Sequence, residues 1–116
     1  MLQQHVGSTC GTISVEKCIG LIAKAINHGM NKTEKVKIVL ENMSRQGNTI
    51  GGDFKELKMI IDLVKDKSRI GVCIDTCHAM AAGMMLIYLD MLKHSNLKVL
   101  FTFQDMTSQS RRALIR

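Results

Sequence analysis

The sequence has no apolar run long enough to cross a bilayer, so we expect no transmembrane helix. Its longest apolar stretch, Ala79 to Leu89, ends at Asp90 and predicts a buried helix instead. No GxGxxG follows a predicted strand, which leaves a dinucleotide-binding fold without support. The start of the chain shows no signal-peptide or transit-peptide pattern, and we expect an intracellular protein.

Cysteine pairs of the CxxC type are also absent, although the chain contains four cysteines. We expect reduced thiols, with disulfides as the alternative, and a location in the nucleus of a eukaryotic source or the cytoplasm of a bacterial one. Cys73 lies in an apolar run and is predicted to be core. Cys77 has no neighbouring thiol and is not counted as a metal ligand. The remaining two are Cys10 and Cys18.

The chain is basic, with a formal net charge of +6 and a pI near 9.4. This balance permits an anionic partner such as nucleic acid. It does not require one, because acidic residues alternate with the lysines along most of the chain. Only the C-terminal tail is distinctly basic, with Arg111, Arg112 and Arg116. A length of 116 residues predicts one domain.

Apolar residues at helical spacing predict three helices. The first is capped by Ser14 and ends at Asn31-Lys32-Thr33. Its apolar positions are Val15, Cys18, Ile19, Ile22 and Ile26. The second begins at the cap pair of Asp53 and Glu56, and its apolar positions are Phe54, Leu57, Ile60, Ile61 and Val64. The third spans about Ala79 to Lys93.

Short apolar runs predict three strands, at Lys37 to Leu40, Arg69 to Asp75 and Leu97 to Phe103. Helices of about 12 residues between strands are typical of βαβ units and a parallel sheet. The continuous apolar character of the strands fits a sheet covered on both faces. Three strands make a thin sheet with two exposed edges. We therefore predict an α/β fold, a slice of a larger architecture, with about three parallel strands alternating with helices.

The most informative segment is Gly71 to His78, with the sequence GVCIDTCH. Its apolar run ends in Asp75, and His78 follows three residues later. A carboxylate that closes a buried strand requires a cation, a hydrogen-bond network or water. A solvated aspartate at a strand end is the simpler alternative to a metal ligand.

Two further polar side chains stand at equivalent places in the repeating unit. Glu41 follows the predicted strand at Lys37 to Leu40, which comes before the strand that ends at Asp75. His5 precedes the first helix, where an earlier strand would end. In α/β barrels, chemistry collects where strands end. Histidine and carboxylate suit zinc or manganese, and such a cluster could activate a water and clamp a phosphate. Taken singly, an exposed His5 and a Glu41 that accepts strand-end hydrogen bonds are the simpler interpretations.

Three segments form a recognisable set: His5-Val6-Gly7-Ser8; Glu41-Asn42 followed by Gln46-Gly47 and Gly51; and Asp66 to Ala79 followed by Ala81-Ala82-Gly83. They resemble the motifs of the endonuclease IV family of apurinic/apyrimidinic endonucleases (AP endonuclease family 2). Val6 replaces a proline of the first motif, and Arg45 stands where the second usually has a glycine. The resemblance covers 5–83, whereas 84–116 diverge.

The resemblance implies a (β/α)₈ barrel, or TIM barrel, that holds three zinc ions and cleaves DNA on the 5′ side of abasic sites. It implies that His5 binds the first zinc and that Glu41 bridges the first and second. Asp75 would bind the second zinc and His78 the third. Glu41 is the implied catalytic residue, since it would orient the attacking hydroxide.

Asn42 and Gln46 are expected to support these ligands without binding the metal themselves. The DNA-contacting residues are not identified, and no protein partner is evident. The family's earlier strands would precede Met1, and its terminal glutamate ligand would follow Arg116. Thr102-Phe103-Gln104-Asp105 stands where the family has a His-x-Asn-Asp motif.

A catalytic zinc is held by three protein ligands plus water, so the three-zinc site is expected to be incomplete here. We therefore expect 1–116 to be a fragment of a TIM-barrel AP endonuclease domain: a truncated product, an incomplete gene prediction or a degenerate copy. A non-catalytic remnant with residual metal or DNA binding is the alternative function. A sugar isomerase also carries Glu, Asp and His at strand ends, but the block Asp75-Thr76-Cys77-His78 favours the nuclease.

Overall fold

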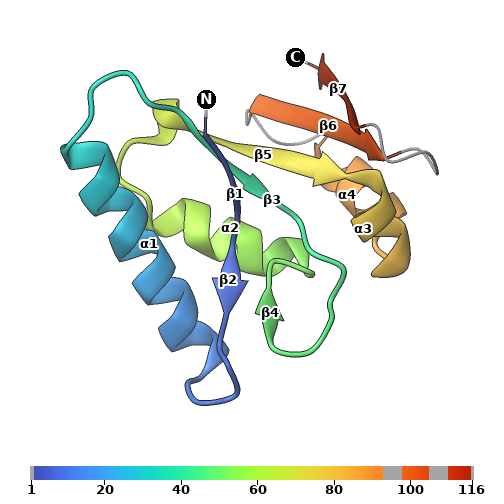
Figure 1. Cartoon of the computed structure of the whole chain (residues 1–116), viewed down its shortest axis with the longest axis horizontal. Coiled ribbons are helices and arrows are strands. Elements are labelled where there is room, and N and C mark those ends of the chain that lie inside the picture. Colours follow the sequence, from blue (N-terminus) through green and yellow to red (C-terminus); the bar gives the residue numbers. More distant parts are fainter. Residues whose placement is uncertain (1, 93–97, 105–109, 116) are drawn as a thin grey trace.

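The computed structural model describes residues 2–92, 98–104 and 110–115. A five-stranded sheet crosses the molecule (Figure 1), and its strands follow the order β1 (Leu2–His5), β3 (Ile38–Glu41), β5 (Ile70–Asp75), β6 (Lys98–Gln104) and β7 (Ser110–Ile115). The first four strands are parallel, and β7 runs antiparallel to β6. This parallel sheet confirms the predicted α/β fold.

Helices alternate with the parallel strands, as in a TIM barrel. They are α1 (Val15–Asn31), α2 (Phe54–Leu63), the 3₁₀ turn η1 (Lys67–Arg69), α3 (Thr76–Ala81) and α4 (Met85–Leu92). A small antiparallel pair, β2 (Gly7–Ser8) and β4 (Thr49–Ile50), joins the loops that follow β1 and β3. In Figure 1, α1 and α2 pack together beside the sheet. None of the helices in the described part of the chain is long and apolar enough to cross a bilayer.

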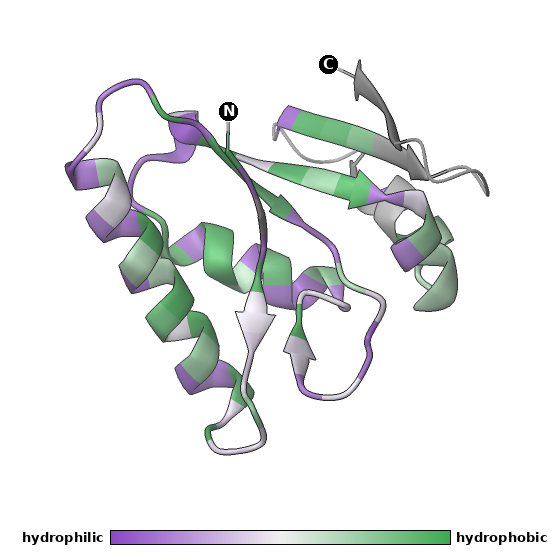
Figure 2. Cartoon of the chain, viewed as in Figure 1, coloured by the Kyte–Doolittle hydropathy of each residue, from purple (hydrophilic) through white to green (hydrophobic). Residues whose placement is uncertain are grey.

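The strands are apolar at successive positions because both faces of the sheet are packed. Ile38 and Leu40 of β3 belong to the main core, together with side chains of α1 and α2. Val39 points the other way and forms a second buried cluster with Cys73 and Leu100. We call the face that carries this second cluster the inner face. Figure 2 shows the apolar residues along β3 and β5 and on the sides of α1 and α2.

The starts of the first two helices follow the predicted capping chemistry. The Ser14 hydroxyl accepts the Lys17 N–H at 3.2 Å, and the Asp53 carboxylate accepts the Lys55 N–H at 2.9 Å. Glu56 does not complete a capping box with Asp53, because its carboxylate accepts the Gly51 N–H at 2.7 Å instead. It thereby ties the start of α2 to the preceding loop.

The apolar stretch predicted as one buried helix from Ala79 to Lys93 is two helices. Gly83 adopts φ +67° and separates α3 from α4, since a residue in the left-handed region ends a helix. The stretch is also more exposed than predicted, because Met80 and Leu86 have 70% and 81% of their surface accessible. Lys93, the predicted last residue, lies outside the described residues.

The sheet contains β1 and β7 in addition to the three strands predicted from apolar runs, and β1 ends at His5, where an earlier strand was expected to end. β1 has the sequence Leu-Gln-Gln-His, in which polar residues obscure a strand pattern. β7 includes Arg111 and Arg112 of the basic tail, whereas Arg116 lies outside the described residues. Leu97, the predicted first residue of β6, lies outside them too. The four cysteines are free thiols, and Cys73 is buried as predicted.

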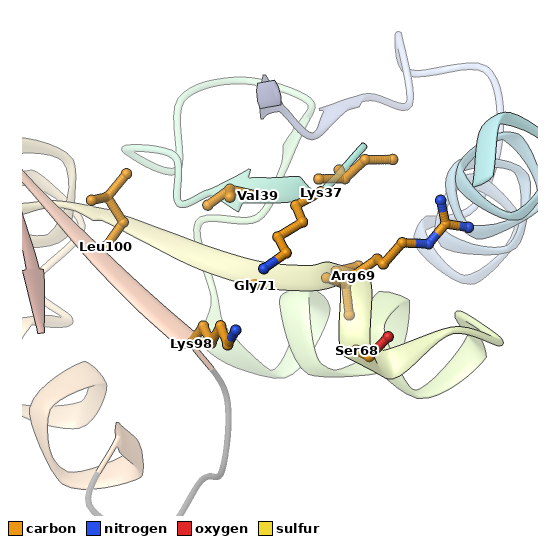
Figure 3. A pocket seen from close by; sticks show the side chains of 9 residues that line it. Lys37, Val39, Ser68, Arg69, Gly71, Lys98 and Leu100 are labelled. Atoms are coloured by element: carbon orange, nitrogen blue, oxygen red, sulfur yellow. The ribbon is translucent and has the colours of Figure 1, made fainter. Parts of the chain in front are cut away.

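A cavity of about 170 Å³ opens on the inner face at the N-terminal end of the strands. Val39, Gly71 and Leu100 line it from three strands, and the side chains of Lys37 and Lys98 reach toward it (Figure 3). A Cβ at Gly71 would lie 2.8 Å from the Lys98 carbonyl oxygen. Strands β5 and β6 can therefore approach closely here because Gly71 has no side chain.

Candidate metal centre

The strand register brings the predicted ligands to the C-terminal end of the sheet. His5 pairs with Glu41 and Glu41 with Cys73, so all three point to the inner face. Asp75 lies two residues after Cys73 and points to the same face at the end of β5. His78 follows in the first turn of α3. Ends of neighbouring parallel strands thus supply the cluster, as the barrel rule predicts.

The four side chains meet in one place. Ligand atoms of Glu41, Asp75 and His78 all lie within 4.8 Å of one another. His5 Nε2 lies 2.9 Å from Glu41 Oε2, and the His5 and His78 ring centroids are 6.4 Å apart. The convergence expected from the sequence is therefore present in the structure.

Asp75 is the most deeply buried of the four, with none of its surface accessible. Its Oδ1 accepts the His78 N–H at 3.0 Å and caps α3. Its Oδ2 is buried and has no hydrogen-bond partner among the described residues, and His78 Nδ1 lies 4.0 Å away. An unpaired buried carboxylate oxygen is costly, and a bound cation would offset that cost.

Glu41 is buried, whereas His5 remains open to solvent. The Glu41 side chain is 6% exposed and that of His5 65%. Glu41 Oε2 also accepts a hydrogen bond from Gln3 Nε2 at 3.0 Å. Gln3 is not among the residues predicted from the sequence, although its place two residues before His5 puts both on the same face of a strand.

Asn42 and Gln46, the two expected supporting residues, differ in their placement. Asn42 is fully buried and hydrogen-bonds to the backbone of Asp75 through both atoms of its side-chain amide. Gln46 lies exposed on the loop after β3, where its carbonyl accepts hydrogen bonds from Thr49. The roles assigned to them remain predictions.

The cluster offers two carboxylates and two imidazoles, a donor set that suits zinc or manganese. The Asp75 Oδ2 atom is the strongest sign of a cation site, because no described residue forms a hydrogen bond with it and His78 Nδ1 is 4.0 Å away. The residues present therefore fit a divalent metal ion. Glu41 lies between His5 and the Asp75–His78 pair.

Comparison with known proteins agrees with this arrangement. A family profile described as "Xylose isomerase-like TIM barrel" matches residues 1–110. An "Apurinic-apyrimidinic endonuclease" of Caenorhabditis elegans is 55% identical over 83 residues, which are 72% of this chain and 21% of that protein. A "Probable endonuclease 4" of Phocaeicola vulgatus is 47% identical over 87 residues, 75% of this chain and 31% of that protein. One of Chlorobium phaeovibrioides is 47% identical over 83 residues, 72% of this chain and 30% of that protein.

The chain thus spans between 21% and 31% of the length of these curated relatives. These similarities confirm the resemblance to the endonuclease IV family that the sequence motifs indicated. Parallel strands alternating with helices, polar ligands at the strand ends and the profile match all agree. The chain belongs to the xylose isomerase-like TIM barrel family.

Proposed function

We propose that this chain supplies part of the metal centre of a zinc-dependent DNA repair endonuclease that cleaves 5′ to abasic sites. The observation that carries the proposal is the convergence of Glu41, Asp75 and His78 within 4.8 Å around an unpartnered carboxylate oxygen. The similarity to proteins named AP endonuclease and endonuclease 4 supports DNA with abasic sites as the substrate. Since the chain spans about a fifth to a third of them, the activity belongs to the larger architecture.

The burial and position of each residue indicate which proposed ion it would bind. Glu41, Asp75 and His78 would hold one divalent ion, and His5 with Glu41 would hold a second through the shared carboxylate. When bound, the metal supplies positive charge that stabilises the phosphate oxygens and activates water. Glu41, fixed by Gln3 and His5, would orient the attacking water toward phosphorus. His5 is the exposed member and lies where a phosphate can approach.

Ligand number sets how many ions this chain can hold. A zinc ion in an enzyme usually has three protein ligands plus water. Glu41, Asp75 and His78 lie close enough together that they would provide three ligands to one ion, whereas His5 and Glu41 would provide two to another. We propose that one ion binds tightly and a second weakly. In this arrangement His78 would share an ion with Asp75, whereas the family resemblance implies that it holds the third zinc.

A non-catalytic remnant is the second candidate, and one observation favours it. β7 pairs antiparallel with β6 at the sheet edge where a TIM barrel continues with a parallel strand. The antiparallel strand β7 therefore covers the edge of β6 to which the next parallel barrel strand would pair. Such a chain would keep metal binding, and its net charge of +6 would favour DNA phosphates.

A metal titration and an incision assay on the same purified chain test both candidates. We expect one tightly bound zinc per chain and no incision of an abasic-site duplex, because the second ion lacks ligands. Asp75→Asn should lose the tight zinc. Strong, EDTA-sensitive incision would contradict the incomplete site and establish a complete enzyme. A chain that binds no zinc and does not prefer abasic over intact duplex would contradict both candidates.

In a longer protein that contains the remaining barrel strands, Glu41→Gln tests the catalytic role. The substitution keeps the shape of the side chain but removes the carboxylate that would orient the water. We expect incision to be abolished while DNA binding is largely preserved. Turnover close to that of the unsubstituted protein would refute the role of Glu41.

A further inference from the structure

The hydrogen-bond ladder between β3 and β5 changes character at Asn42. The Asn42 N–H still donates to the Cys73 carbonyl at 3.2 Å, as a regular parallel ladder requires. In that ladder the Asn42 carbonyl would next accept the Asp75 N–H. Instead the side-chain Oδ1 of Asn42 accepts that N–H at 2.6 Å, and Nδ2 donates to the Asp75 carbonyl at 3.2 Å. One side-chain amide thus satisfies both backbone groups of Asp75.

The backbone path explains why a side chain is needed here. Directly after Asn42 the chain leaves the sheet, since the Met43 N–H donates to the Gly51 carbonyl at 2.9 Å. No backbone beyond residue 42 therefore runs beside Asp75, and residue 42 is the last that can serve it. Asn42 and Asp75 are both fully buried, so water cannot replace the missing ladder partners easily.

Because the Asn42 side chain accepts the Asp75 N–H, the backbone carbonyl of Asn42 is free to accept a hydrogen bond from another partner. His78 Nδ1 lies 3.0 Å from that carbonyl oxygen. A carbonyl oxygen only accepts hydrogen bonds, so Nδ1 carries the ring hydrogen in this geometry. The other ring nitrogen, Nε2, then keeps the lone pair that a metal ligand needs.

We propose that Asn42 is a positioning residue that selects the metal-binding tautomer of His78. The side-chain amide of Asn42 forms hydrogen bonds with the backbone N–H and carbonyl of Asp75. The backbone carbonyl of Asn42 therefore remains available to accept a hydrogen bond from His78 Nδ1. The same clamp holds Asp75, whose Oδ1 in turn bonds to the His78 N–H. This inference rests on the proposed metal site, and hydrogen bonds behind a histidine ligand are a known means of fixing its ring.

The tautomer can be measured without metal, by long-range ¹H–¹⁵N NMR of the His78 ring at a pH where it is neutral. We expect the Nδ1–H form in the unsubstituted chain. In Asn42→Ala the Asp75 N–H can return to the carbonyl of residue 42, and His78 should shift toward the Nε2–H form. Zinc affinity, measured separately by titration, should fall by about 10- to 100-fold.

Asn27 offers a matched control away from the site. Its Nδ2 donates to the Leu63 carbonyl at 3.1 Å and its Oδ1 accepts the Lys65 N–H at 2.8 Å, so its amide also bonds to one backbone carbonyl and one N–H, here of two residues. Asn27→Ala should leave the His78 tautomer and the zinc affinity unchanged.

Two results would overturn the inference. One is an Nε2–H form of His78 in the unsubstituted chain, which decides the matter even if Asn42→Ala does not fold. The other is a tautomer that stays the same in a folded Asn42→Ala. A tautomer that depends on Asn42 in a chain that binds no zinc would refute the proposed metal function and leave the hydrogen-bond relationship standing.

Discussion

His5 Nε2 lies 2.9 Å from Glu41 Oε2, which joins the C-terminal ends of the neighbouring strands β1 and β3. The pair is asymmetric, because the Glu41 side chain is 6% exposed and that of His5 65%. Glu41 faces inward toward Asp75 and His78, whereas His5 borders solvent. In the proposed metal centre, the buried carboxylate would be shared between an enclosed ion and a more open one.

His5→Ala should separate two steps of zinc binding. The tight step depends on Glu41, Asp75 and His78, so it should persist with little change. The weak step should be lost, because its ion would keep Glu41 as its single protein ligand. Isothermal titration of the chain with zinc measures both. His28→Ala, at an exposed histidine near the end of α1, is the control. Loss of the tight step in His5→Ala would contradict the division of ligands.

Asp75→Asn should remove the increase in thermal stability that zinc gives the chain. The asparagine keeps an oxygen that can cap α3 but loses the buried charge of the unpartnered Oδ2. In the unsubstituted chain, zinc at 100 times its Kd should add about 2.7 kcal/mol to the free energy of unfolding. Asp75→Asn should show almost none of this gain in thermal unfolding with and without zinc. An equal zinc-dependent rise in both proteins would exclude Asp75 as a ligand.

Asp66 should contribute to the pH dependence of stability. Hydrogen bonds from the side chains of Ser68 and Arg69 lower the pKa of its carboxyl below the ordinary value of 3.8. A carboxyl whose pKa is lowered by folding stabilises the native state above its unfolded pKa, and this stabilisation is lost as the pH falls through the folded pKa. Asp66→Asn should therefore flatten the fall in the urea midpoint below about pH 4.

Ser68→Ala tests the cause of that effect. It removes the hydroxyl that donates to Asp66 Oδ1 at 2.6 Å, while the Arg69 contact at 2.7 Å remains. The pKa of Asp66 should rise partway toward its ordinary value, as followed by carboxyl ¹³C NMR. An Asp66 carboxyl that already titrates at 3.8 in the unsubstituted chain would disprove the explanation.

Two glycine substitutions should change stability in opposite directions. In Gly71→Ala the new Cβ would lie 2.8 Å from the Lys98 carbonyl oxygen, and separating β5 from β6 should cost about 1–3 kcal/mol. Gly20 lies exposed in α1, where a Cβ would have no neighbouring atom within 4 Å, so Gly20→Ala should stabilise by about 0.5–1 kcal/mol. Urea unfolding of both variants measures the difference. Equal effects would show that the close approach of β5 and β6 is not rigid.

Local patterns in the sequence predicted much of the fold. Ser14 and Asp53 mark helix starts because their side chains cap the first turn, a contact within a few residues. The apolar runs of β3 and β5 also predict buried strands, because this pattern too is contained within a few consecutive residues. The prediction of a single long helix after Asp75 was wrong, because Gly83 interrupts a uniformly apolar stretch that has no other break.

The amino-acid sequence was enough to predict the proposed ligands His5, Glu41, Asp75 and His78, which stand at or just after strand ends. The contact of Gln3 with Glu41 and that of the Asn42 carbonyl with His78 are visible in the folded chain alone. These contacts depend on strand register and on the point where β3 leaves the sheet. Both are set by packing between distant segments, which periodicity along one segment does not encode.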